Sequence, residues 1–209
     1  MRYHWLDPYL CAKHCVTKDV QPVWNWVRYQ IGGEKIAAIC FDEKKQPYYI
    51  NLKADPAEAE FLRKQYADIL PGYYSDKRTW ISIQPDGAVP DDLLRDLLDR
   101  AYRLMLQGFS KKRQREILHI SCCGTDCDGC EFYHKDCAGC NECGGRVFHA
   151  PPGKVCPIYA CSVQKHRYVT CANCKEMPCA LWQTTRDPQL SDQAFEQSIQ
   201  ERIQNLKEI

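Results

Sequence analysis

The sequence predicts an α+β fold, an antiparallel sheet with flanking helices, followed by a small metal-stabilised cysteine-rich domain that ends in a helix. Three observations lead to this expectation. In the first half, short runs of β-forming residues are separated by turn residues, and apolar residues then recur at helical spacing. Of the 15 cysteines, 12 fall between Cys122 and Cys179. We expect a first domain at 1–110, a basic linker at 111–118 and a cysteine-rich domain at 119–209.

A hairpin is the clearest part of the predicted sheet. Residues 24–31 and 35–41 are rich in β-forming side chains, and Gly32-Gly33 between them can supply the positive φ angles of a tight turn. Further strands are expected at 48–53 and at 79–84, where the pattern alternates.

Two helices are expected after these strands. Asp55-Pro56-Ala57-Glu58 has the pattern of a capping box with proline at the first helical position, and Pro71-Gly72 ends the helix that it opens. A second helix at 90–107 carries an apolar stripe typical of a core helix. The stripe consists of Leu93, Leu94, Leu97, Leu98, Ala101, Leu104 and Met105.

Composition and charge limit the classes of function that this chain can have. The chain has 209 residues, 44% of them hydrophobic and 26% charged, as in ordinary globular proteins. No stretch approaches the roughly 20 apolar residues that cross a bilayer, and no signal peptide is visible, so we expect a soluble cytoplasmic protein with no membrane contact. Residues 1–115 hold 19 Lys and Arg against 15 Asp and Glu, and 116–209 hold 9 against 12. Any nucleic acid should therefore meet the first half.

The cysteines are spaced as metal ligands. Pairs separated by two residues can turn two thiolates onto one ion, and zinc takes four ligands tetrahedrally. Large apolar residues are few between Cys122 and Cys179, so a metal would supply folding energy that the core lacks. A disulfide framework would need an export signal. The sequence therefore predicts zinc, with two ions. The expected ligands are Cys123, Cys127, Cys130, Cys137, Cys140, Cys156, Cys161, Cys171, Cys174 and Cys179.

An iron–sulfur cluster is the alternative cofactor. The spacing Cys137-x2-Cys140-x2-Cys143 is similar to ferredoxin-type ligation, in which three close thiolates and a distant one hold the cluster. Histidines could also replace a thiolate, but the cysteines suffice for two sites, so we interpret the histidines as surface residues. They are His134, His149 and His166.

The first half resembles the MmcQ/YjbR-like family over residues 5–108. The resemblance rests on NLKADP at 51–56, PGYYSDKRTW at 71–80 and DGAVPDDLL at 86–94, in the family's order and spacing. It implies an antiparallel sheet with flanking helices, of the double-wing type, and members are commonly labelled DNA-binding. One departure is Tyr74-Ser75-Asp76, where many relatives place a small residue followed by His or Met.

The second half resembles an uncharacterised cysteine-rich domain of bacteria and archaea, over residues 120–185. CGTDCDGC opens it at 123–130, and a C-x-G-C pair, CPIYAC and a C-x-x-C-x-x-x-P-C element follow in order. The resemblance implies zinc binding and supplies no activity. Cys122 and Cys143 lie outside its pattern.

Basic and aromatic residues form one candidate surface for nucleic acid, because cations neutralise phosphates and rings stack on bases. They are Tyr73, Tyr74, Lys77, Arg78, Trp80, Lys111, Lys112, Arg113 and Arg115. The chain has no recognisable catalytic triad, carboxylate pair or phosphate-binding glycine motif, so an enzyme is not predicted. The prediction is a non-enzymatic, zinc-stabilised binding or regulatory protein that contacts nucleic acid through its first domain. A protein-interaction adaptor and an iron–sulfur redox protein are the alternatives.

Overall fold

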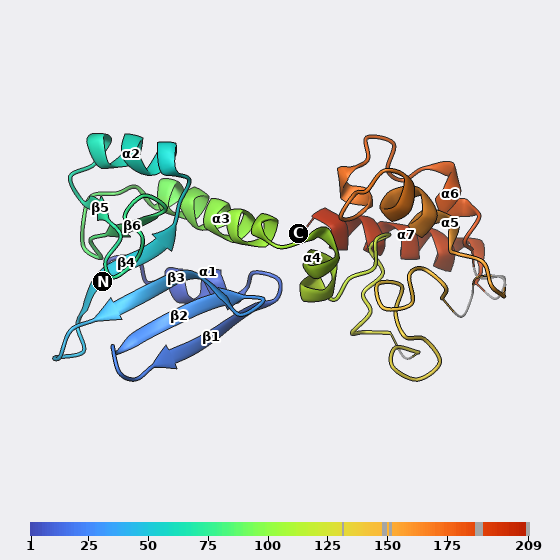
Figure 1. The fold of residues 1–209 in the computed structure, drawn as a ribbon, viewed down its shortest axis with the longest axis horizontal. Helices are drawn as coiled ribbons and strands as arrows, with labels where there is room; N and C mark the ends of the chain where they lie inside the picture. The colour runs from blue at the N-terminus through green and yellow to red at the C-terminus, as the bar shows by residue number, and fades with distance from the viewer. Residues whose placement is uncertain (131, 148–149, 151, 187–189, 208–209) are drawn as a thin grey trace. The chain divides into compact units, whose positions relative to one another are not determined.

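The structure, a computed structural model, describes residues 1–130, 132–147, 150, 152–186 and 190–207. The chain forms two compact units, Met1–Phe109 and Ser110–Ile209, which we call the first unit and the second unit. Figure 1 shows strands in the first unit and helices and irregular backbone in the second. Within the described ranges, no helix combines the length and the apolar run needed to cross a membrane.

A six-stranded antiparallel sheet forms the first unit, in the order β1-β2-β3-β4-β6-β5 (Figure 1). Its strands are β1 (Val16–Gln21), β2 (Trp26–Ile31), β3 (Glu34–Phe41), β4 (Pro47–Lys53), β5 (Ile69–Pro71) and β6 (Trp80–Ile83). Gly32 and Gly33, both at positive φ, join β2 to β3 and confirm the predicted hairpin. The two edge strands, β1 and β5, have no counterpart among the predicted strands.

The helices of the first unit are α1 (Leu6–Cys11), α2 (Pro56–Gln65) and α3 (Asp91–Gly108). The Asp55 carboxylate accepts hydrogen bonds from the backbone N–H groups of Ala57 and Glu58, at 2.9 and 3.2 Å, and so caps the helix as predicted. The Glu58 carboxylate, expected to complete a capping box, pairs with Arg100 instead. α2 ends at Gln65, earlier than Pro71-Gly72, because the chain leaves the helix and enters β5. α3 contacts β2, β3 and β4. Its buried residues are Leu94, Leu97, Leu98, Ala101, Tyr102 and Leu106.

The two faces of the sheet differ in chemistry. Residues directly opposite each other on antiparallel strands point to the same face, so the register assigns the side chains. One face is apolar and includes Tyr29, Ala37, Leu52 and Ile81, all buried. The other, which we call the aromatic face, combines rings with polar groups. It carries Trp26, Arg28, Ala38, Cys40, Tyr49, Asn51, Lys53, Trp80 and Ser82.

The second unit contains α4 (Lys111–Leu118), α5 (Pro157–Tyr159), the π-helical turn η1 (Ala160–Lys165), the 3₁₀ turn η2 (Cys171–Asn173), α6 (Ala180–Gln183) and α7 (Asp192–Lys207). Residues 111–118, expected to be a linker, are therefore a helix of this unit. Its first turn is capped by Ser110, whose hydroxyl accepts from the Arg113 backbone N–H at 3.2 Å.

The core of the second unit mixes sulfur with apolar side chains from beyond residue 179. Trp182 of α6 is 1% exposed, and α7 adds Phe195, Ile199 and Leu206. The predicted shortage of apolar residues therefore holds for 122–179 but is partly made up by the two following helices. The buried cysteines of this core are Cys122, Cys140, Cys156 and Cys171.

Helix α7 packs closely against the start of the cysteine-rich segment. Arg202 Nε donates to the Cys123 carbonyl at 3.1 Å, and Asn205 Nδ2 donates to the Gly124 carbonyl at 2.9 Å. Gly124 has φ +86°, and a Cβ there would lie 2.2 Å from the Arg202 carbonyl oxygen. Only glycine satisfies both the backbone angle and this approach.

Candidate functional site

One small pocket of the second unit gathers four of the ten predicted metal ligands. Cys161, Cys171, Cys174 and Cys179 line it, with Trp182 among its apolar walls. Local structure explains their positions. The π-helical turn η1 carries the first cysteine, η2 begins at the second, and α6 begins directly after the last. A capping box that begins at Thr170 fixes η2.

Other predicted ligands lie in or against the sulfur-rich core. Cys140 and Cys156 are buried, and Cys123 and Cys137 pack against the core from its partly buried margin. Cys127 and Cys130 are also partly buried. All 15 cysteines are free thiols.

Cys122, which lies outside the family-like pattern, belongs to the centre of this core. It is 2% exposed, and its thiol hydrogen-bonds to that of Cys140. This hydrogen bond lowers the pKa of Cys140 and, together with burial, raises the pKa of Cys122. The pair thus favours one thiolate over two. The spacing of the cysteines in the sequence does not predict this contact, because Cys122 lies directly before the regular motif and is not one of its spaced pairs.

The thiols are close neighbours but are not arranged around a common centre. Across the described parts of the chain, no three Cys, His, Asp or Glu side chains are placed to hold a metal ion as they stand. The donor chemistry nevertheless fits zinc, because four thiols from two short segments line one pocket, and four cysteine thiolates are a common ligand set of structural zinc.

The histidines take different positions. His166 lines the same pocket and stacks on Tyr168, with 5.3 Å between ring centroids. His134 lies against Tyr133, with 3.9 Å between ring centroids. His149 lies outside the described residues. We expected all three histidines to be surface residues without a role, but His166 lies at the pocket lined by the cysteines.

The predicted nucleic-acid residues of the first unit are not uniformly exposed. Tyr74 is 78% exposed and the Arg78 side chain 85%, and Lys77 is exposed as well. Trp80 is only 8% exposed, and Tyr73 is partly buried in the aromatic cluster. Three of the five can thus meet a ligand directly.

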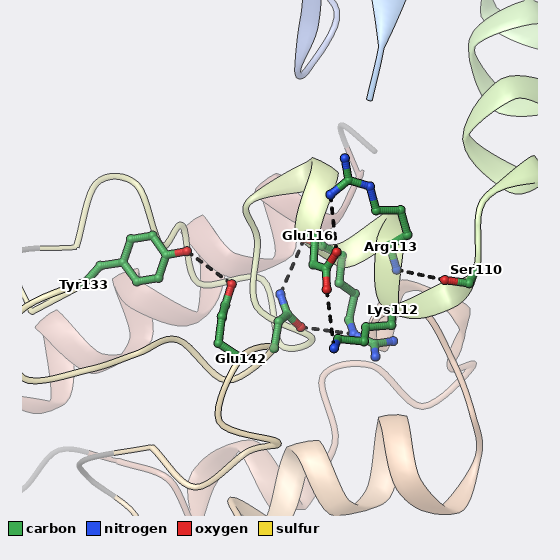
Figure 2. A network of polar contacts seen from close by, with 8 residues as sticks. Ser110, Lys112, Arg113, Glu116, Tyr133 and Glu142 are labelled. Atoms are coloured by element: carbon green, nitrogen blue, oxygen red, sulfur yellow. Dashed lines mark hydrogen bonds and ion pairs between the residues drawn. The ribbon is translucent and has the colours of Figure 1, made fainter. Parts of the chain in front are cut away.

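The other predicted cations belong to α4. Figure 2 shows the Glu116 carboxylate between the ends of Lys112 and Arg113, with ion pairs at 3.7 and 3.4 Å. Lys111 Nζ donates to the Arg167 carbonyl at 2.6 Å. These cations already have partners within the second unit.

Arg115 is a structural residue of the second unit. It is 5% exposed, and its Nε donates to the Asn141 side-chain oxygen at 3.0 Å. Asn141 in turn donates to the Ile120 carbonyl at 3.2 Å. A buried guanidinium held in this way is not available to a phosphate.

Charge is distributed differently between the structural units than between the sequence halves. Met1–Phe109 holds 15 Lys and Arg against 15 Asp and Glu, so the first unit is neutral. The excess of four cations counted for residues 1–115 lies entirely in 110–115, which the structure assigns to the second unit. Net charge therefore does not favour the first unit as the contact for nucleic acid, and only its local exposed cations can do so.

A chain of hydrogen bonds crosses the aromatic face of the first unit. Ser82 Oγ donates to Asn51 Oδ1 at 2.9 Å, and Asn51 Nδ2 donates to the Tyr73 carbonyl at 2.7 Å and to Ser75 Oγ at 3.2 Å. Lys35 Nζ donates to the same Ser75 oxygen at 3.2 Å. Asn51 and Ser82 are both 0% exposed. Of these residues, only Tyr73 was a predicted site residue, and Ser75 was noted only as part of a departure from the family pattern. The lysine at the start of an otherwise apolar strand was a visible signal.

Comparison with known proteins places the first unit in a family. A family model described as YjbR matches residues 12–104. The uncharacterised protein YbdF of Escherichia coli O157:H7 is 35% identical over 89 residues, which are 43% of this chain and 71% of YbdF. The chain belongs to the YjbR family. The uncharacterised protein YjbR of Escherichia coli K12 is 26% identical over 111 residues, 52% of this chain and 94% of YjbR.

Two solved structures are also similar. The Deinococcus radiodurans protein DR2400 has 27% identity and a TM-score of 0.49, covering 54% of this chain and 84% of its own. A Pseudomonas syringae protein has 19% identity and a TM-score of 0.42, covering 50% of this chain and 98% of its own. The YjbR match ends within the first unit, so the likeness of residues 120–185 to a cysteine-rich zinc domain stays an expectation.

Proposed function

We propose that this YjbR-family protein is a non-enzymatic binding or regulatory protein whose second unit is stabilised by zinc. The observation that carries the proposal is the pocket lined by Cys161, Cys171, Cys174 and Cys179. Bound zinc would cross-link η1, η2 and the start of α6, three short elements with little regular structure between them. So many free thiols persist only in a reducing compartment, which favours the cytoplasm.

The ligands of a second zinc ion would come from the remaining predicted cysteines. Cys123, Cys140 and Cys156 belong to one core with Cys122, so the second ligand set is expected there. Its members would replace thiol hydrogen bonds with metal–thiolate bonds, and each bound thiol would release its proton.

The test is elemental analysis of the purified protein, followed by chelation. We expect about two zinc ions per chain, as two sets of four thiolates require. Removing them should increase hydrogen exchange across residues 157–186 and leave the six-stranded sheet unchanged. Cys174→Ser should lower the zinc content, whereas Cys11→Ser, at an exposed cysteine of the first unit, should not.

Iron with sulfide in the purified protein would establish the redox alternative in place of zinc. If neither metal is present and chelation leaves exchange of residues 157–186 unchanged, the zinc proposal is wrong. The thiols would then act as small apolar side chains of a conventional core.

For the partner, we propose nucleic acid contacted through the first unit. What supports this is the exposed pair Lys77 and Arg78 close in sequence to the exposed ring of Tyr74. Affinity for a random duplex or single strand should fall with salt, and replacing both cations with Ala should make the slope shallower by about two. The matched control is Lys44→Ala with Lys45→Ala, two adjacent exposed cations of the β3–β4 turn. No binding at low salt would favour the protein-interaction adaptor.

A further inference from the structure

Lys35 occupies an unusual position for a lysine. Its ammonium lies 4.3 Å from the ring centroid of Trp80 and 5.0 Å from that of Trp26, and Ser75 Oγ is its hydrogen-bond acceptor. Lys35 forms no ion pair with the residues that the structure describes. Burial lowers the pKa of Lys35 below its ordinary value; the neighbouring Cys40 thiol opposes this shift and Arg28 adds to it. The side chain is only partly buried, so it is not sealed from solvent.

A second lysine shares the same ring. Lys53 Nζ lies 5.7 Å from the centroid of Trp80, and in the described structure it too has no ion pair. The nearby carboxylate is that of Asp76, which already accepts from the Arg78 backbone N–H at 2.9 Å and pairs with the Arg78 side chain at 3.8 Å. Asp76 acts on Lys53 only at longer range, so two ammonium groups lie near one tryptophan and neither forms an ion pair among the described residues.

Elsewhere in the first unit, a comparable cation has an acidic partner. Lys13 also lies over a ring, 4.5 Å from the centroid of Tyr9, but it pairs with Asp99. On the aromatic face itself, Arg28 Nε donates to Asp19 at 2.9 Å. Since a partly desolvated cation is stabilised by a paired anion, the lack of one at Lys35 among the residues that the structure describes points to a partner from outside them.

The surroundings indicate what such a partner would look like. The Lys35 ammonium has three N–H donors, and among the described residues it makes one hydrogen bond, to Ser75. The aromatic cluster continues from Trp26 to Trp24, 5.5 Å away and 57% exposed, and through Tyr73 to Tyr74, 4.6 Å from Tyr73 and 78% exposed. An oxyanion could take the free donors while an attached apolar body covers a ring.

We propose that Lys35 anchors a binding site for a small organic anion, a carboxylate or phosphate group carried on an aromatic or apolar body. Lys53 is its second cation, and the Ser82–Asn51–Ser75 hydrogen-bond chain positions the Ser75 hydroxyl that accepts from Lys35. A compact anion suits the site better than a long polyanion, because the first unit as a whole is neutral. The inference goes beyond the proposed function, since it depends on neither zinc nor nucleic acid.

The test is calorimetric titration of the full chain with inorganic phosphate, benzoate and AMP. We expect saturable binding of benzoate or AMP below about 10 mM, and a loss of at least about tenfold in affinity in Lys35→Gln. Lys35→Arg should retain most of the affinity, and Lys53→Gln should lose less than Lys35→Gln. Lys13→Gln is the matched control, because this lysine lies over a ring but has its own carboxylate, and it should bind as the parent does.

A second measurement needs no variant. The bound ligand should protect Lys35 from an amine-acylating reagent, as mapped by peptide mass spectrometry, and should leave the exposed Lys64 unprotected. No saturable binding of any probe, a smaller loss than about tenfold in a folded Lys35→Gln, or no protection of Lys35 would overturn the proposal. If an oligonucleotide binds equally well to the parent and to Lys35→Gln while AMP and benzoate do not bind, this site fails and the nucleic-acid proposal stands.

Discussion

Replacing Asn51 with alanine should destabilise the first unit severely. The side chain is 0% exposed and makes three hydrogen bonds, to the Tyr73 carbonyl, to Ser75 Oγ and from Ser82 Oγ. Alanine removes the side-chain donor to the Tyr73 carbonyl and the acceptor of the Ser82 hydroxyl proton, although Ser82 Oγ still accepts from the Tyr73 backbone N–H at 2.8 Å. A buried donor or acceptor left unsatisfied costs about 1–3 kcal/mol, so two of them predict a loss of about 2–6 kcal/mol in the free energy of unfolding. That is a large share of the roughly 5–15 kcal/mol of a typical domain.

Urea unfolding of the full chain measures this loss when it is followed by hydrogen exchange in peptides from β4 and β6, which report on the first unit alone. The matched control is Gln30→Ala, an amide whose Nε2 makes one exposed hydrogen bond to the Gly33 carbonyl at 3.2 Å. It should cost less than about 0.5 kcal/mol, as surface substitutions usually do. A loss in Asn51→Ala no greater than in the control would refute the assignment of Asn51 as the centre of a buried network.

Two further predictions concern other parts of the chain. Gly124→Ala should detach α7, because its Cβ would meet the Arg202 carbonyl at 2.2 Å; faster hydrogen exchange across Asp192–Lys207 is the expected result, and unchanged exchange would contradict it. Asp7→Asn should reduce the loss of stability that the first unit shows as the pH is lowered. Hydrogen bonds from Lys18 and Tyr29 lower the pKa of Asp7, so its contribution is complete above the ordinary value of 3.8 and is lost as the pH falls through the lower folded value. Thermal unfolding of both proteins from neutral pH downwards checks this, and parallel profiles would count against it.

The sequence predicted those parts of the first unit whose signals are local. Gly32-Gly33 defines the hairpin through backbone angles, and the Asp55 cap defines the start of α2. The edge strands β1 and β5 escaped prediction for a physical reason. The first is largely polar and the second has three residues, so neither shows a period, and only pairing with β2 and β6 makes them strands.

The second unit shows where such reasoning stops. Residues 111–118 contain so many charges that they resemble a linker, yet they form α4, and two of the side chains that this helix buries are the polar Gln114 and Arg115. Polar residues on a buried face give no apolar stripe to detect. In the same way, motif spacing identified the cysteines as a group but could not reveal that Cys122 lies beside Cys140, which depends on the path of the chain between them.

The attachment of α7 to Gly124 also has a consequence for the order of events during synthesis. The contacts that join them bridge sequence separations of 79 and 81 residues, so the segment at Cys123 leaves the ribosome long before its partner helix exists. The first unit also contains long-range hydrogen bonds, such as that of Tyr9 to Asp99 across 90 residues, but all of its residues are made before the second unit begins. Domains generally fold in the order in which they emerge. The newly made thiols therefore pass through a period in which they are solvated and reachable, before α7 encloses them. In that interval they can be supplied with metal or oxidised, and which of the two happens depends on the cell rather than on the finished structure.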